Sequence, residues 1–171
     1  GGEVELDLEM VEMVRDPLTH IIRNAIDHGL EGPGERLKTG KREIGLLKFA
    51  ARQAGNQITI VITDDGRGID TDRLAAKAVA AGIYSQSEVD EMSERRRHYL
   101  IFEPGLSTAE QVSSVSGRGV GMDVVRANIE RVGGSIAVSS KPDEGTSFFL
   151  RLPLTLSIIA ALTVSSGGQR Y

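Results

Sequence analysis

The stretch His20-Ile-Ile-Arg-Asn-Ala-Ile-Asp-His28 is the most informative part of this sequence. Its polar side chains fall on one face at helical spacing, and isoleucine and alanine fill the rest of the helix. The polar stripe consists of His20, Asn24, Asp27 and His28. A lone histidine here would most often be satisfied by neighbouring backbone. Four polar groups in register, including a carboxamide oxygen that can ligate Mg²⁺, favour a binding function.

Two glycine-rich turns follow, Asp64-Asp-Gly66-Arg-Gly68 and Gly117-Arg-Gly119-Val-Gly121. Glycines at alternate positions let the backbone approach a ligand closely and expose N–H groups to phosphate oxygens. The first turn ends an apolar strand, so the Asp64 carboxylate can accept the exocyclic amino proton of adenine. The second opens a helix, whose N-terminus favours a phosphate. A lone Asp-x-Gly-x-Gly is more often an ordinary turn. The two glycine turns and the helix stripe together predict an ATP site.

The commonest glycine-rich nucleotide folds are excluded. No Gly-Lys-Ser/Thr closes a phosphate loop, and neither turn has the G-x-G-x-x-G spacing of a dinucleotide site. We therefore expect the nucleotide to be held by a different architecture.

Composition bounds the remaining classes. With 171 residues, 40% hydrophobic and 26% charged, the chain is an ordinary globular domain. The net charge of −4 argues against binding nucleic acid, and the run Arg95-Arg96-Arg97 next to acidic residues indicates a solvated helix face. The most apolar stretch, residues 152–164, is too short and interrupted to insert into a membrane. Without cysteines or a recognisable signal peptide, we expect a cytoplasmic protein.

Periodicity and capping signals predict strands and helices along the whole chain. The predicted strands are residues 4–6, 44–53, 57–64, 135–140 and 147–154, and the predicted helices are 7–15, 16–28, 71–81, 85–97 and 122–132. Glycines and a proline mark residues 32–42 as a loop. Strands with helices on one face predict a two-layer α/β sandwich. Residues 103–118, rich in Ser, Thr and Gly, predict either a lid over the nucleotide or a plain surface connection.

These motifs resemble those of the chemotaxis histidine kinases of the CheA type. The resemblance rests on His20 to Glu31, Asp64 to Gly68, Phe102 to Thr108, Ser116 to Met122, Gly145-Thr146 and Leu152 to Leu156, over residues 4–164. It implies the Bergerat ATP-binding fold shared with gyrase, Hsp90 and MutL, in which a mixed sheet backs the helices. It also implies a catalytic domain at residues 1–155 and, at 156–171, the truncated start of a C-terminal regulatory domain.

The resemblance also implies roles for residues. Asn24 would hold Mg²⁺ on the ATP phosphates, Asp64 would bind the adenine amino group, and Thr146 would support a water there. Glycines of both turns would contribute backbone, Ser107 would be a lid contact, and basic groups would line the phosphate end. The implied set comprises His20, Arg23, Asn24, Asp27, His28, Asp64, Gly66, Gly68, Arg73, Ser107, Gly117, Gly119, Gly121 and Thr146.

The implied reaction is transfer of the ATP γ-phosphoryl group to a histidine. Hydrolysing relatives carry glutamate where this chain has His20, so a water-activating carboxylate is missing there and transfer is favoured over hydrolysis. None of the three histidines lies in a plausible phosphoacceptor helix. We therefore expect a separate histidine phosphotransfer domain as substrate, with a coupling adaptor, receptors and a response regulator as partners of the longer protein. The chain alone is expected to be a monomer.

Two alternatives stay open. An ATP-driven clamp of the gyrase or Hsp90 type would share the site but would need glutamate at position 20. A non-catalytic nucleotide-binding or scaffold module of a signalling array would bind ATP and transfer nothing. Phosphotransfer to a cognate histidine domain distinguishes the kinase from the scaffold.

Overall fold

The computed structural model describes residues 8–106, 121–154, 165–166 and 169–170. Its helical elements are α1 (Leu8–Asn24), the π-helical η1 (Ala25–Gly29), α2 (Pro33–Lys38), α3 (Thr71–Ala80), α4 (Gln86–Asp90), α5 (Glu94–Tyr99), the 3₁₀ element η2 (Leu100–Phe102) and α6 (Met122–Arg131). Its strands are β1 (Leu47–Ala54), β2 (Gln57–Asp64), β3 (Ser135–Lys141), β4 (Gly145–Pro153), β5 (Ser165–Ser166) and β6 (Gln169–Arg170). None of the described helices is long and apolar enough to cross a membrane.

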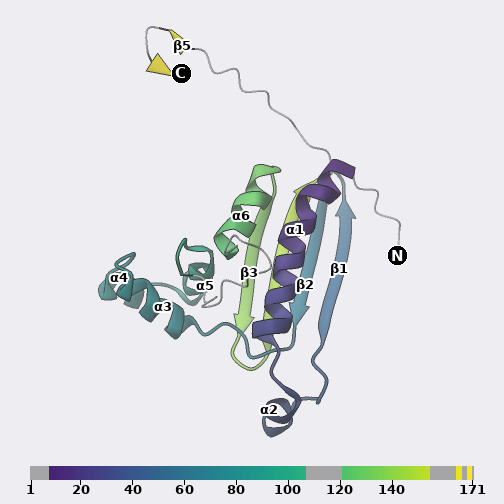
Figure 1. Ribbon diagram of the computed structural model, residues 1–171, viewed down its shortest axis with the longest axis vertical. Coiled ribbons are helices and arrows are strands. Elements are labelled where there is room, and N and C mark those ends of the chain that lie inside the picture. The colour runs from purple at the N-terminus through teal and green to yellow at the C-terminus, as the bar shows by residue number, and fades with distance from the viewer. Residues whose placement is uncertain (1–7, 107–120, 155–164, 167–168, 171) are drawn as a thin grey trace, which may run out of the picture.

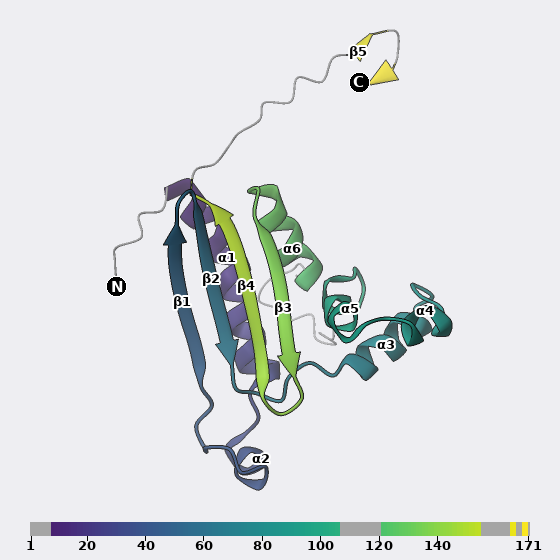
Figure 2. The same cartoon turned by 180° about the vertical axis from the view of Figure 1, so that it is seen from behind.

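The architecture is a two-layer sandwich, as predicted. Strands β1 to β4 form one sheet in the order β1-β2-β4-β3. Helices α1 and α6 lie across one face of this sheet (Figure 1), and no described helix covers the opposite face (Figure 2). Every pairing in the described sheet is antiparallel, so this part differs from the mixed sheet that we expected. The strand expected at residues 4–6 lies outside the described residues.

The core lies between the sheet and α1 with α6. The three isoleucines of β2 alternate along one face and are buried, at 0–3% exposure for Ile58, Ile60 and Ile62. They pack with buried side chains of α1 and α6, among them Met10 and Ile129. At the β1–β2 turn, Gly55 has φ 59°, a conformation that two-residue hairpin turns require. This hairpin places the end of β2 at the lower end of the sheet in Figure 1.

Two expected boundaries are wrong. The helices predicted at 7–15 and 16–28 join into one continuous helical segment, α1 followed by η1, and Pro17 lies inside α1. Proline costs a helical hydrogen bond, but the buried stripe of α1 runs through Pro17 in one register, so packing outweighs that loss. The predicted loop contains a short helix, α2, which begins with Pro33 at its first position.

The single helix predicted at 85–97 is in fact two helices, α4 and α5. The capping box at Ser85 and Glu88 is present and begins α4, but this helix ends at Asp90. Ser93 then caps a second helix, α5, by accepting a hydrogen bond from the Arg96 N–H. The second serine cap was the available signal for this break. Helices α3, α4 and α5 enclose a small second core around Leu74 and Leu100.

Candidate functional site

A cavity of about 400 Å³ lies between α1, η1, α3, η2, α6 and the ends of β2 and β4. It brings together eight of the residues predicted for the site: His20, Asn24, Asp27, His28, Asp64, Gly68, Arg73 and Thr146. These residues come from segments more than a hundred positions apart in the sequence. The predicted convergence of the helix stripe and the first glycine turn is therefore present.

The helix stripe ends in a π-turn. The Leu30 N–H donates to the Ala25 carbonyl at 2.8 Å, five residues back, and closes η1. Wide turns of this kind are rare and are frequently found at functional sites. Here Asp27 and His28 lie on the widened turn, are exposed, and line the cavity together with Gly29. Gly29 ends the helical segment, as predicted.

Asn24 offers one oxygen to the cavity. Its side-chain amide nitrogen donates to the sulfur of Met122 at 3.3 Å, and no hydrogen bond within the described residues reaches its carboxamide oxygen. No group of three His, Asp or Glu side chains that could bind a metal is found among the described residues. The oxygen fits a Mg²⁺ ion whose other ligands are phosphates and waters, the manner in which this ion usually accompanies nucleotides.

His20 lies one turn before Asn24 and is half-buried. Burial, with the charge of Arg23 as a second cause, lowers the pKa of the His20 imidazole below its ordinary value. The nearby carboxylate of Asp123 opposes this shift. At neutral pH the side chain is therefore a neutral imidazole, which can donate or accept a hydrogen bond.

Asp64 is the buried carboxylate of the cavity, with 4% exposure. Its Oδ1 atom accepts from the backbone N–H of Gly66 at 2.9 Å and of Thr146 at 3.3 Å. In the described part of the chain no hydrogen bond reaches Oδ2, so this atom is free to accept from a ligand. Burial raises the pKa of the Asp64 carboxyl, although the two N–H groups favour its charged form.

The two glycines of the first turn have different roles. Gly66 does not line the cavity. A Cβ at this position would collide with the Gly29 carbonyl oxygen. Its role is to let the end of β2 approach η1, where the Arg67 N–H donates to that oxygen at 2.9 Å. Gly68 does line the cavity and has φ 79°, a conformation that favours glycine. The predicted ligand role of Gly66 is thus not supported by its position.

Thr146 is buried next to Asp64. Its hydroxyl lies 3.1 Å from that of Ser140, whose oxygen also accepts from the Ile69 N–H at 2.8 Å. Ser140 therefore joins the segment after the glycine turn to β3 and β4. We did not identify Ser140 from the sequence, because a serine at the end of a predicted strand gives no signal.

Some predicted residues lie elsewhere. Arg23 is exposed on the helix and does not line the cavity. Gly121 is buried as the residue that precedes α6, with φ −87°, and also lies outside the lining. Ser107, Gly117 and Gly119, with most of the predicted lid, lie outside the described residues.

The structure adds residues that the sequence reasoning missed. The further lining residues are Ala25, Gly29, Arg67, Ile69, Asp70, Leu74, Ile101, Leu106, Met122 and Phe148. Most are apolar, and they form the walls that a flat aromatic base requires. Arg67 lies within the predicted glycine turn and Asp70 lies just after it, and that proximity was the available signal.

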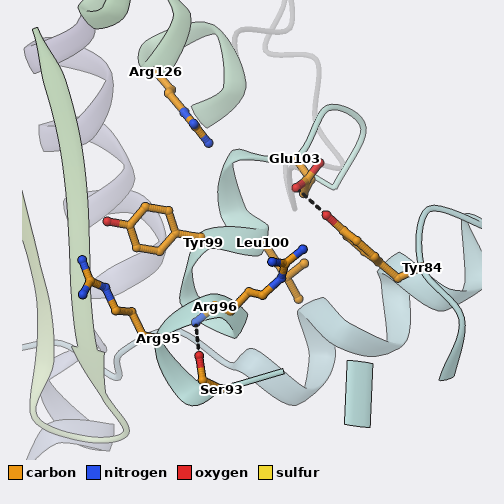
Figure 3. A pocket seen from close by; sticks show the side chains of 8 residues that line it. All are labelled: Tyr84, Ser93, Arg95, Arg96, Tyr99, Leu100, Glu103 and Arg126. Carbon is orange, nitrogen blue, oxygen red and sulfur yellow. Dashed lines mark hydrogen bonds between the residues drawn. The ribbon is translucent and has the colours of Figure 1, made fainter. Parts of the chain in front are cut away.

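A second cavity of about 330 Å³ lies beyond η2. Figure 3 shows the guanidinium groups of Arg96 and Arg126 facing it, and the Tyr84 hydroxyl donates to Glu103 at 2.8 Å in its wall. None of the predicted site residues lines this cavity. Of the basic run, Arg95 and Arg96 are exposed as predicted, whereas Arg97 is half-buried and donates to Asp72 at 3.2 Å.

Comparisons with known proteins agree with this geometry. A family model described as histidine kinase-, DNA gyrase B-, and HSP90-like ATPase matches residues 13–156. The sensor histidine kinase CheAY of Helicobacter pylori is 49% identical over 171 residues, which cover 100% of this chain and 21% of that protein. The chemotaxis protein CheA of Salmonella typhimurium is 45% identical, with 100% of this chain and 25% of that protein covered.

The fold is also found in a solved structure. The blue-light activated histidine kinase of Erythrobacter litoralis EL346 matches with a TM-score of 0.52 and 17% sequence identity, over 90% of this chain and 33% of that one. At this identity the likeness concerns the fold alone. The chain spans about a quarter of the length of the curated relatives that it matches, from 21% to 28%.

Proposed function

Because the chain belongs to the histidine kinase-, DNA gyrase B- and HSP90-like ATPase family, we propose that it is the ATP-binding catalytic domain of a chemotaxis histidine kinase. It would transfer the γ-phosphoryl group of ATP to a histidine on a separate phosphotransfer domain. The observation that carries this proposal is the single cavity that joins Asn24 and His20 to Asp64 and Thr146. The identity to chemotaxis kinases over the full chain gives further support.

The two ends of the cavity suggest how ATP lies in it. The buried Asp64 carboxylate, with Oδ2 free, suits the 6-amino group of adenine between apolar walls such as Ile69 and Phe148. Asn24, His20 and Arg73 suit the triphosphate, because they offer an oxygen for a cation, a neutral imidazole and a positive charge. Adenine and the phosphates would thereby contact different lining residues of one pocket.

The transfer step needs alignment and charge neutralisation more than covalent help from the protein. A lone pair on the acceptor imidazole forms the N–P bond. The bond from the γ-phosphorus to the bridging oxygen breaks, and that oxygen keeps the electron pair and leaves with ADP. The proton on the other imidazole nitrogen is released to solvent. Mg²⁺ bound to the phosphates, with Asn24 as its protein ligand, would neutralise charge.

The missing carboxylate at position 20 supports transfer over hydrolysis. Burial lowers the pKa of the His20 imidazole, which makes it a weaker base toward water than an ordinary histidine. We propose that residues 1–155 form the catalytic domain, in agreement with the family match over 13–156. Residues 156–171 would begin a regulatory domain. The adaptor, receptors and response regulator would be partners of the longer cytoplasmic protein.

The experiment is phosphotransfer from γ-labelled ATP by the 171-residue chain to a CheA-type phosphotransfer domain. Label is expected on the acceptor histidine, and an acceptor in which that histidine is replaced by glutamine is the control. Binding of Mg²⁺-ATP without transfer to several acceptor domains would favour the scaffold reading. Absence of ATP binding would refute the proposal.

A further inference from the structure

Arg36 is almost completely buried, at 1% exposure, although it does not line either cavity. It belongs to α2, which lies beyond the end of β2 in Figure 1. A buried guanidinium is strongly unfavourable unless it is paired and hydrogen-bonded. Its partners therefore indicate what it does.

Those partners all lie on or around the turn after β2. The guanidinium donates to Glu31 at 3.0 Å and to the Asp65 carboxylate at 2.7 Å. It also donates to the Asp65 carbonyl oxygen at 3.2 Å and to the Arg42 carbonyl oxygen at 2.8 Å. These four hydrogen bonds engage all three guanidinium nitrogens, a geometry that lysine cannot reproduce.

Lys41 reinforces the same contacts. Its ammonium group pairs with Glu31 at 2.6 Å and donates to the carbonyl oxygens of Asp65 at 3.0 Å and Gly66 at 2.8 Å. Two cations and two carboxylates thus balance one another. Together Arg36 and Lys41 hold two consecutive carbonyl groups of the turn.

The peptide group between Asp65 and Gly66 connects this network to the cavity. Its oxygen accepts from Arg36 and Lys41, and its N–H donates to Asp64 Oδ1 at 2.9 Å. Because a peptide group is planar, fixing its oxygen also fixes the direction of its N–H. Arg36 and Lys41 therefore fix the direction of the N–H that, together with the Thr146 N–H, holds Asp64 Oδ1.

We propose that Arg36 is a positioning residue for base recognition: it orients the Asp65–Gly66 peptide, which holds Asp64 so that Oδ2 reads the 6-amino group of adenine. This inference rests on the proposed nucleotide function. The charges support it, because Asp65 and Glu31 raise the pKa of the Asp64 carboxyl, after the larger effect of burial. Arg36 and Lys41 neutralise both neighbours.

The test measures discrimination rather than affinity alone. Dissociation constants for ATP and for purine riboside triphosphate, which lacks the 6-amino group, are determined by calorimetry on the 171-residue chain and on Arg36→Met. The ratio of the two affinities is expected to fall about tenfold in Arg36→Met, the low end for one hydrogen bond to a charged group. The control is Arg15→Met, which removes an exposed pair with Asp16 at 3.4 Å and should leave the ratio unchanged.

The same affinity ratio, measured in the Asp64→Asn variant, distinguishes positioning of Asp64 by Arg36 from general support of the fold. In Asp64→Asn the ratio should already be low, and adding Arg36→Met should not lower it further. If Arg36→Met fails to fold by circular dichroism, Asp65→Asn replaces it and should lower the ratio in the same direction.

Three outcomes would overturn the inference. A folded Arg36 variant that weakens both nucleotides equally would show a merely structural role. A ratio that falls as much in the Asp64→Asn background would show that Arg36 acts by another route. If the unmodified chain binds ATP and the analogue equally, the role of Asp64 fails, whereas absence of ATP binding refutes the proposed function itself.

Discussion

The amide nitrogen of Asn24 lies 3.3 Å from the sulfur of Met122, so the end of α1 contacts the first residue of α6 across 98 positions of sequence. This contact turns the carboxamide oxygen away from Met122. It also ties the helix stripe to the helix that follows the second glycine turn. The helix stripe and α6 are therefore held together, although residues 107–120 between them lie outside the described residues.

The first prediction concerns Asn24 itself. Asn24→Ala should abolish Mg²⁺-dependent ATP binding, because the one protein oxygen proposed for the ion is lost. The side chain is only half-buried, so stability should change by less than about 1 kcal/mol. Calorimetric titration with a non-hydrolysable ATP analogue, with and without Mg²⁺, measures the first effect, and thermal unfolding measures the second. Unchanged magnesium-dependent affinity would refute the assigned role.

The second prediction concerns Asp64→Asn. Asparagine keeps an oxygen for the Gly66 and Thr146 N–H groups but replaces the free acceptor Oδ2 with a donor. Adenine recognition should weaken, with loss of preference for ATP over GTP. Measured affinities for both nucleotides check this, and a preference for ATP equal to that of the unmodified chain would contradict it.

The thermal stability of Asp64→Asn should increase near neutral pH, although its preference for ATP decreases. The folded-state pKa of Asp64 is raised, so the unfolded chain loses this proton first and the buried charge destabilises the fold at neutral pH. Asp64→Asn should therefore unfold at a higher temperature near pH 7. The difference should shrink as pH falls and disappear below the ordinary carboxyl value of about 3.8, where both forms are neutral. Thermal unfolding from pH 7 to pH 3 measures it, and a lower melting temperature for the variant at pH 7 would refute it.

The site residues that could be predicted are those that lie in short sequence patterns with local geometry. Asn24 and Asp64 were found because each lies in a short pattern whose geometry is local: a helix face, and a strand followed by a glycine turn. Alternation likewise predicted the buried face of β2. In contrast Arg36 lies in a segment that reads as a polar loop, and its burial arises from partners at Glu31 and Asp65 that only the folded chain brings together.

The wrong helix boundaries also arise from contacts that only the folded chain brings together. Pro17 is a correct local signal against a continuous helix, but the core contacts of α1 on both sides of it decide the outcome. Gly66 was predicted as a nucleotide-binding glycine because glycine patterns do not show what lies against the missing side chain. The neighbouring carbonyl group of Gly29 belongs to η1, a distant earlier segment of the chain.

The third prediction tests that view of Gly66. Gly66→Ala should destabilise the fold by about 3 kcal/mol and abolish nucleotide binding, because the added Cβ meets backbone atoms of Gly29 that cannot move aside. Gly34→Ala is the matched control, since Gly34, like Gly66, has no positive φ, and nothing lies within 4 Å of its Cβ position. It should not destabilise the fold, because alanine is favoured over glycine inside a helix. Denaturant unfolding of both variants measures the difference, and equal changes would mean that the Gly29 contact does not disfavour a side chain at position 66.

The last prediction concerns the pH dependence of stability at His20. Its folded-state pKa lies below the ordinary value of 6.5, chiefly because of burial. As pH falls through 6.5 the unfolded chain therefore binds a proton that the folded chain resists, and stability decreases. His20→Gln removes this proton and should flatten the stability curve between pH 7 and pH 5. Urea unfolding at several pH values measures the slope, with His28→Gln as a control for an exposed histidine in the same cavity. If His20→Gln leaves the slope unchanged while His28→Gln flattens it, the burial argument for a neutral His20 is wrong.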